Sequence, residues 1–201
     1  MKTTFNVLGV AGSTRRGSYS TQALKIALEH AKKQGAEVRL LEIANMPLYD
    51  PNAPASKEVE LVAKAVSWAD AFIIASPDYH GSMSGALKNF LDHFYEEFAG
   101  KIFGFIVASH EKGLTVMDQM RTAVRQCYGW SMPYGVSVNG PQDFTGGELV
   151  NARLSKRMQM MARDLVVYGR LLNSQFLRDL GSSEKTHLQH TIGRECDRVL
   201  Q

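Results

Sequence analysis

The sequence predicts one α/β domain in three layers, with an open, doubly wound parallel sheet between helices on both faces. Five short runs rich in Val, Ile, Leu and Phe lack regular polar alternation, which is typical of strands buried on both faces. Segments with helical apolar spacing separate these runs, as the crossovers between parallel strands require. A chain of 201 residues, 44% of them hydrophobic, can bury one core of this kind.

The predicted elements alternate along the chain. The expected strands are 5–10, 38–43, 71–75, 102–107 and 134–138, and the expected helices are about 24–31, 61–69, 87–98, 115–128 and 154–168. Gly35 is the expected stop of the first helix, and the three prolines of 45–54 indicate a surface loop. The large apolar residues of 87–98 exceed what one helix face needs, which favours a subunit interface there.

Two strand orders are compatible with this alternation, the flavodoxin-like order and the larger dinucleotide-binding order. Five strands in so short a chain favour the flavodoxin-like order 2-1-3-4-5. We therefore expect a single domain over residues 1–201 with a C-terminal tail from about residue 173. In either order ligands bind beyond the carboxyl ends of the strands, so the loops after Val10, Ala75 and Val107 are the candidate sites.

Charge and cysteine content argue against several kinds of partner. The net charge of +3 comes from scattered residues without the long basic runs of a nucleic-acid or membrane footprint. Cys127 and Cys196 indicate no disulfide, and His187, His190 and Cys196 lack a convincing fourth metal ligand. No segment reaches membrane-spanning length, and the start resembles a strand and loop rather than a signal peptide. We expect a soluble cytoplasmic protein with no metal.

The loop between the first strand and the first helix is the first candidate site. It reads Gly12-Ser13-Thr14-Arg15-Arg16-Gly17-Ser18-Tyr19-Ser20. Free N–H groups and the helix dipole favour an anion there, and its hydroxyls with Arg15 or Arg16 suit a terminal phosphomonoester. The G-x-G-x-x-G and G-x-x-x-x-G-K-[ST] patterns are absent, which favours flavin mononucleotide over a dinucleotide. A Ser18 helix cap with solvated arginines explains this loop alone equally well.

The second and third loops follow the third and fourth strands. In Ser76-Pro77-Asp78-Tyr79-His80-Gly81-Ser82, Pro77 and Gly81 fix a turn whose backbone groups suit the polar edge of an isoalloxazine. Tyr79 and His80 add flat surface or hydrogen bonds, which a plain turn would not need. The third loop reads Ser109-His110-Glu111-Lys112-Gly113.

The first loop, together with Ser76-Pro77-Asp78-Tyr79-His80-Gly81-Ser82-Met83-Ser84-Gly85-Ala86-Leu87-Lys88-Asn89, resembles the NADPH-dependent FMN reductase family of quinone, azo-dye and chromate reductases. The resemblance covers the chain to about residue 170. Ser20 stands where relatives often have Asn, and Asp78-Tyr79-His80 where many have Glu-Tyr-Asn. In the third loop only Gly113 matches the glycine pair of relatives.

The resemblance implies FMN as cofactor and NADPH or NADH as electron donor. The implied FMN-binding residues are Ser13, Arg15, Ser18, Tyr19 and Ser20 in the first loop, Pro77, Asp78, Tyr79, His80 and Gly81 in the second, and Ser109, His110, Lys112 and Gly113 in the third. It also implies a homodimer or homotetramer.

The expected reaction passes electrons from the nicotinamide through FMN to a quinone or a similar acceptor, such as an azo compound, a nitro compound, chromate or free flavin. No catalytic side chain is required, and His80 or His110 is more simply a solvated loop residue than a proton donor. The alternatives are a flavin-binding electron carrier, against which the positive net charge argues weakly, and a regulatory protein that has lost the cofactor.

Overall fold

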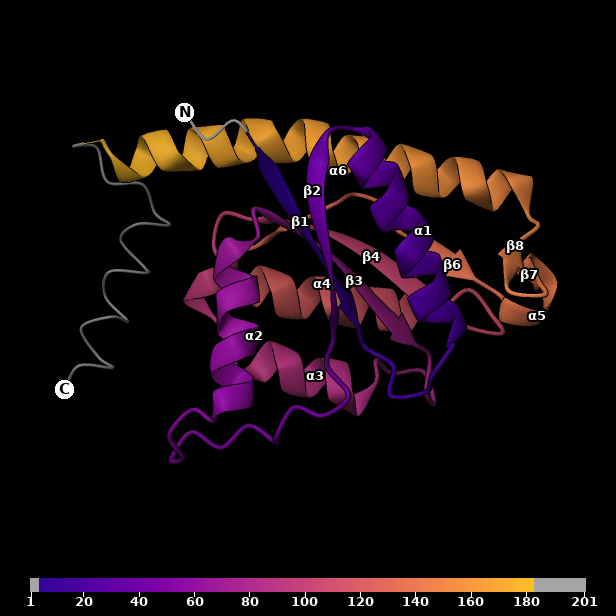
Figure 1. The fold of residues 1–201 in the computed structure, drawn as a ribbon, viewed down its shortest axis with the longest axis horizontal. Helices are drawn as coiled ribbons and strands as arrows, with labels where there is room; N and C mark the ends of the chain where they lie inside the picture. The colour runs from indigo at the N-terminus through magenta and orange to yellow at the C-terminus, as the bar shows by residue number, and fades with distance from the viewer. Residues whose placement is uncertain (1–3, 183–201) are drawn as a thin grey trace.

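The computed structural model describes residues 4–182, and these residues form a central parallel sheet between two layers of helices (Figure 1). The strands of this sheet are β1 (Phe5–Ala11), β2 (Ala36–Glu42), β3 (Ala71–Pro77), β4 (Ile102–Ala108), β5 (Trp130–Ser131) and β6 (Val136–Val138). The helices are α1 (Tyr19–Lys33), α2 (Lys57–Trp68), α3 (Gly85–Asp92), α4 (Leu114–Gln126), α5 (Gly140–Asp143) and α6 (Ala152–Leu180), with a 3-10 turn η1 at Glu96–Phe98. Strands β7 (Phe144–Thr145) and β8 (Glu148–Leu149) form a separate antiparallel hairpin.

The strand order β2-β1-β3-β4-β5 confirms the predicted flavodoxin-like order. The expected single fifth strand is instead two short strands, because β5 pairs with the start of β4 and β6 with its end. The sheet therefore has six strands, two of which share the last position. The chain between β5 and β6 leaves the ladder and returns to it, which the apolar run alone does not reveal.

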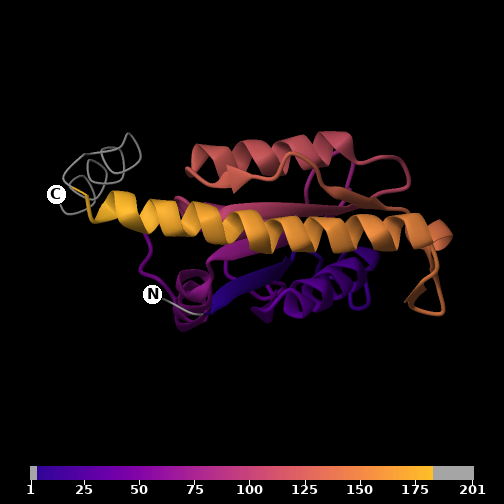
Figure 2. The ribbon, with the colours of Figure 1, turned by 90° about the horizontal axis from the view of Figure 1, so that it is seen from above.

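Two apolar cores lie on the two faces of the sheet. Alternate residues of β3 point to opposite sides, so Ile73 packs with α1 and α6 while Phe72 and Ile74 pack with α2, α3 and α4. Figure 2 shows α6 lying along the sheet, with α1 and α4 on either side. This burial on both faces is why the strands read as continuous apolar runs.

The predicted third helix is shorter than its apolar stripe. Helix α3 ends at Asp92, and the chain turns through η1. The turn brings Phe98 edge-on against Phe72, with ring centroids 5.4 Å apart, and Phe94 against Phe90 at 5.3 Å. Both Phe94 and Phe98 are buried within this chain. Their apolar surface is therefore used in the core rather than left over for a subunit interface.

The C-terminal helix extends beyond the predicted length. Helix α6 continues through Asn173 to Leu180, and the rest of the expected tail, residues 183–201, lies outside the described residues, as do His187, His190 and Cys196. Despite its 29 residues, α6 carries too many charges to cross a bilayer, and no other helix within residues 4–182 is long and apolar enough to do so.

Candidate functional site

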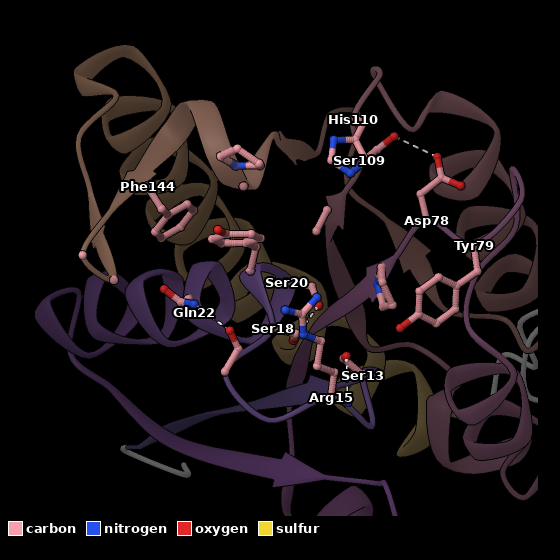
Figure 3. Close-up of a pocket in the computed structure, with 18 residues that line it drawn as sticks. Ser13, Arg15, Ser18, Ser20, Gln22, Asp78, Tyr79, Ser109, His110 and Phe144 are labelled. Carbon is pink, nitrogen blue, oxygen red and sulfur yellow. Dashed lines mark hydrogen bonds between the residues drawn. The ribbon is translucent and has the colours of Figure 1, made fainter.

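A cavity of about 550 Å³ opens at the carboxyl ends of β1, β3 and β4 (Figure 3). This position is the one at which doubly wound sheets bind ligands, and the volume lies within the ~300–1,000 Å³ of small-molecule sites. The cavity is lined by Ser13, Arg15, Gly17, Ser18, Tyr19, Ser20, Gln22, Pro77, Asp78, Tyr79, Ala108, Ser109, His110, Gly140, Pro141, Phe144, Gly146 and Gly147. The structure thus brings all three predicted loops to one cavity.

The first loop, residues 12–20, presents a hydroxyl-lined helix start; we call it the phosphate loop after the ligand that the sequence predicts. Ser18 is the N-cap of α1, and its Oγ accepts from Thr21 N at 3.3 Å. The same Oγ lies 2.8 Å from Thr21 Oγ1 and 3.2 Å from Ser20 Oγ, so three hydroxyls gather at the helix N-terminus. Gly17 has φ +67°, and a side chain there would meet nothing within 4 Å. The loop is open toward the cavity, and Arg15 supplies a positive charge on its lining.

The phosphate loop is locked to the start of α3 by buried serines that the sequence did not single out as site residues. Ser84 Oγ donates to Gly12 O, and Ser84 N donates to Ser76 Oγ at 2.9 Å. Ser76 Oγ in turn donates to Pro77 O at 2.7 Å. Because the two serines and the two carbonyls are neutral and buried, they fix the spacing between the first two loops without adding charge.

The second loop is a tight turn closed by Tyr79 and Ser82, whose backbone groups exchange hydrogen bonds of 3.0 and 3.1 Å. His80 and Gly81 occupy its tip with φ +57° and +75°. Pro77, Asp78 and Tyr79 line the cavity, but His80 and Gly81 do not. The tip of this turn, with its two positive φ values, therefore lies outside the first cavity.

The third loop lies beside the second. Ser109 Oγ donates to Asp78 Oδ2 at 2.8 Å, and Ser109 N donates to Val138 O at 2.9 Å. Gly113 is the N-cap of α4 with φ +58°, where a Cβ would lie 2.5 Å from Val107 Cγ1. Ser109 and His110 line the cavity, whereas Lys112 and Gly113 lead into α4, which begins at Leu114.

The cavity brings together ten of the fourteen predicted residues. Of the other four, Gly81, Lys112 and Gly113 line an adjoining cavity of about 770 Å³. This second cavity shares Asp78, Ser109 and His110 with the first, so the two open side by side. His80 lines neither cavity.

One wall of the cavity was not predicted at all. We call residues 139–149 the hairpin wall; its Gly140, Pro141, Phe144, Gly146 and Gly147 face the cavity. The rings of Phe144 and Tyr19 lie 5.5 Å apart, and a side chain at Gly140 would overlap the Tyr19 ring. The Gly146-Gly147 pair, with φ +60° and +89°, is a recognisable hairpin turn in the sequence. Nothing local shows that this hairpin docks on α1.

A buried carboxylate anchors the hairpin wall. Asp143 Oδ2 accepts from Asn139 N and its Oδ1 from Asn151 Nδ2, both at 2.7 Å. Asn151 is also the N-cap of α6, and Asn139 Nδ2 donates to His110 O at 3.0 Å. One chain of hydrogen bonds therefore joins the third loop, the hairpin wall and α6.

The residues present fit a flavin mononucleotide. The helix N-terminus with its hydroxyls and Arg15 suits a phosphomonoester dianion, as expected for such helix starts. Polar groups of the second and third loops continue along the same cavity and can face a heteroaromatic ring. Together, the flavodoxin-like sheet and this cavity define a nucleotide-binding protein of the flavodoxin-like class.

Comparison with known proteins identifies the family within the flavodoxin-like class. The family model of NADPH-dependent FMN reductase matches residues 5–143, and the chain belongs to this family of oxidoreductases. The chain is 37% identical over 95 residues to an NAD(P)H-dependent FMN reductase of Pseudomonas aeruginosa, covering 46% of this chain and 51% of the relative. It is 36% identical over 92 residues to an NAD(P)H:quinone oxidoreductase of Solanum tuberosum, covering 43% and 47%. The match thus spans about half the length of each relative.

The fold also matches a solved structure. The flavoenzyme NAD(P)H:(acceptor) oxidoreductase of Paracoccus denitrificans superposes with a TM-score of 0.73 at 20% identity. The superposition covers 83% of this chain and 98% of that one. At this identity the similarity shows the shared flavodoxin-like fold.

Proposed function

We propose that the protein is an FMN-dependent NAD(P)H oxidoreductase that delivers electrons to a soluble acceptor, such as a quinone, an azo or nitro compound, chromate or free flavin. The observation that carries this proposal is one cavity joining a hydroxyl-lined helix start to the polar loops after β3 and β4. The family membership supports the same cofactor and donor. When bound, FMN supplies hydride acceptance from the nicotinamide and electron donation to the acceptor.

The chain's own residues bind and orient the cofactor. Ser13, Arg15, Ser18 and Ser20 hold the phosphate in the proposed complex, and Pro77, Asp78, Tyr79, Ser109 and His110 border the ring. The rings of Tyr19 and Phe144 pack against each other and form one side of the cavity. Because the cofactor carries the redox chemistry, no side chain is assigned as a catalytic acid or base.

We also propose that the protein works in the cytoplasm as a homodimer or homotetramer. The exposed apolar side chains of α6, Met160, Tyr168 and Leu171, support an interface on that helix. Light scattering coupled to gel filtration measures the assembly, and a monomer at micromolar concentration contradicts it.

Spectroscopy of the purified protein tests the proposed function. A yellow protein that bleaches on anaerobic addition of NADPH or NADH, and recovers with a quinone, is the expected result. Bleaching only with an added reductase would identify an electron carrier instead. A colourless protein that does not take up FMN rejects the proposal.

The variant Arg15→Ala tests the phosphate assignment. Loss of a charge-assisted bond to phosphate lowers the affinity for FMN by about 1.5–3 kcal/mol, or about 10-fold to 150-fold. The matched control is Arg16→Ala, because Arg16 is exposed in the same loop and does not line the cavity. Titration of the apoprotein with FMN measures both, and equal affinities in the two variants remove Arg15 from the site.

A further inference from the structure

Asp78 places a carboxylate on the wall between the two cavities, and it lines both of them. Its Oδ1 accepts from Gly81 N at 2.9 Å and its Oδ2 from Ser109 Oγ at 2.8 Å. Its backbone N–H donates to Ala108 O at 2.8 Å. Hydrogen bonds from its own loop and from the third loop therefore hold the carboxylate at the cavity wall.

Within residues 4–182 this carboxylate forms no ion pair. Both groups that donate to it, a backbone amide and a hydroxyl, are neutral. Among residues 4–182 the ion pairs join Lys88 to Asp92, Arg121 to Asp118 and Arg163 to Asp164, and none of them involves Asp78. A fixed negative charge therefore acts on whatever occupies the cavity.

We propose that Asp78 lowers the reduction potential of the bound flavin and makes it a stronger reductant. The inference rests on the proposed function. Hydride uptake brings two electrons and one proton, so the ring system gains one negative charge. A carboxylate held in the same partly desolvated cavity repels that charge and disfavours the reduced form relative to the oxidised one.

A substitution of Asp78 can distinguish an effect of its charge on the flavin from its structural role in the turn. Asp78 also shapes the turn, since its Oδ1 caps Gly81 N three residues later. An asparagine keeps the shape of the side chain, retains an oxygen for Gly81 N and offers an N–H to Ser109 Oγ. The substitution Asp78→Asn therefore removes the charge while leaving both contacts available.

The test compares the midpoint potential of FMN in wild type, Asp78→Asn and Glu111→Gln by spectroelectrochemical titration. Glu111 is the matched control, because its exposed carboxylate lines only the second cavity. For Asp78→Asn we expect a more positive potential, with at least a tenfold higher ratio of reduced to oxidised flavin at a given electrode potential. That change equals about 30 mV for a two-electron couple. Glu111→Gln is expected to change the ratio less than threefold.

An unchanged or more negative potential in Asp78→Asn overturns the inference, as does an equal shift in Glu111→Gln. If Asp78→Asn loses flavin during purification, dissociation constants for added oxidised and reduced FMN yield the same quantity. Wild type is then expected to prefer oxidised FMN more strongly than the variant does, by at least tenfold. Wild type that binds no FMN rejects the proposed function itself, whereas a yellow, NAD(P)H-reducible wild type with an unshifted variant rejects only the role of Asp78.

Discussion

The phosphate loop and the hairpin wall close the same cavity from two sides, but they are built differently. At the start of α1 the phosphate loop is held by near neighbours in sequence, for example Ser18 to Thr21 and Gln22 Nε2 to Gly17 O at 2.7 Å. Among the described residues of this loop, only the first, Gly12, bonds to distant partners, such as Ser84. The hairpin wall is held by distant partners, since Asn139 bonds to His110 and Phe144 packs on Tyr19. The phosphate loop thus runs directly into α1, whereas the hairpin wall packs against this helix through Phe144 and Tyr19.

At the junction between the two walls, one buried polar atom has no hydrogen-bond partner among the described residues. Gln22 Oε1 is buried there without a hydrogen-bond partner in the described structure, and a Cβ on Gly147 would lie 4.0 Å from it. A buried acceptor without a donor lowers the stability of the contact. We therefore expect the hairpin wall to open at a lower free energy than the phosphate loop does.

The largest effect is expected from Gly12→Ala in the phosphate loop. A Cβ at this position would lie 2.6 Å from Ala75 O and 3.0 Å from Leu87 Cβ, so backbone must move. We expect a loss of about 3 kcal/mol in the free energy of unfolding, the upper end of overpacking effects, and loss of FMN binding. Urea denaturation measures the first and FMN titration the second.

The matched control for this change is Gly85→Ala. An added Cβ there meets nothing within 4 Å, and the residue begins α3. Alanine in a helix is favoured over glycine, so unfolding free energy should stay the same or rise by up to about 1 kcal/mol. Equal destabilisation by both substitutions would show that the close approach at Gly12 does not matter.

An intermediate effect is expected from Asp143→Ala in the hairpin wall. The substitution leaves the Asn139 and Asn151 donors without their acceptor, which lowers the free energy of unfolding by about 2 kcal/mol. Hydrogen exchange should become faster in residues 139–151 while the amides of α1 keep their protection. The exposed carboxylate of Asp118 provides the control Asp118→Ala, which should change neither. Faster exchange throughout α1 would contradict the independence of the two walls.

The smallest effect is expected from a polar pair outside both walls. Tyr134 Oη donates to Asp164 Oδ2 at 2.6 Å. Burial and then this bond raise the pKa of Tyr134. Burial alone would raise the pKa of Asp164, but hydrogen bonds from Tyr134 and Arg163 outweigh it, and that pKa is lowered. Because the pair is partly solvated, Tyr134→Phe should lower the unfolding free energy by less than about 1 kcal/mol near neutral pH.

The pH dependence of this difference has a defined sign. The contribution of Asp164, whose folded pKa is depressed, is present above its ordinary value of about 3.9 and is lost as pH falls through the folded pKa. The contribution of Tyr134, whose folded pKa is raised, is present below about 10 and is lost as pH rises further. The free energies of unfolding of wild type and Tyr134→Phe should therefore differ most between these two pH limits. The affinity for FMN should be equal in the two proteins at every pH.

Much of the fold was predictable because its signals are local or periodic. The continuous apolar runs of β1, β3 and β4 follow from burial on both faces, and Ser18, Ser56 and Ser84 cap the helices that they precede. The split of the last strand and the end of α3 at Asp92 were not predictable. Both depend on how the chain packs against β4 and the aromatic cluster around Phe72.

The sequence by itself determined the parallel sheet, the position of the phosphate loop and the family. Buried strands, helix caps and contiguous motifs can be recognised because each lies within a short stretch of chain. Only the tertiary structure decided which loop residues meet. It placed His80 outside the cavity, brought Gly140, Phe144 and Gly147 in, and set Asp78 against Ser109. Some of these contacts join residues more than a hundred positions apart, such as Tyr19 and Phe144. They can form only after the sheet has brought the loops together at one edge.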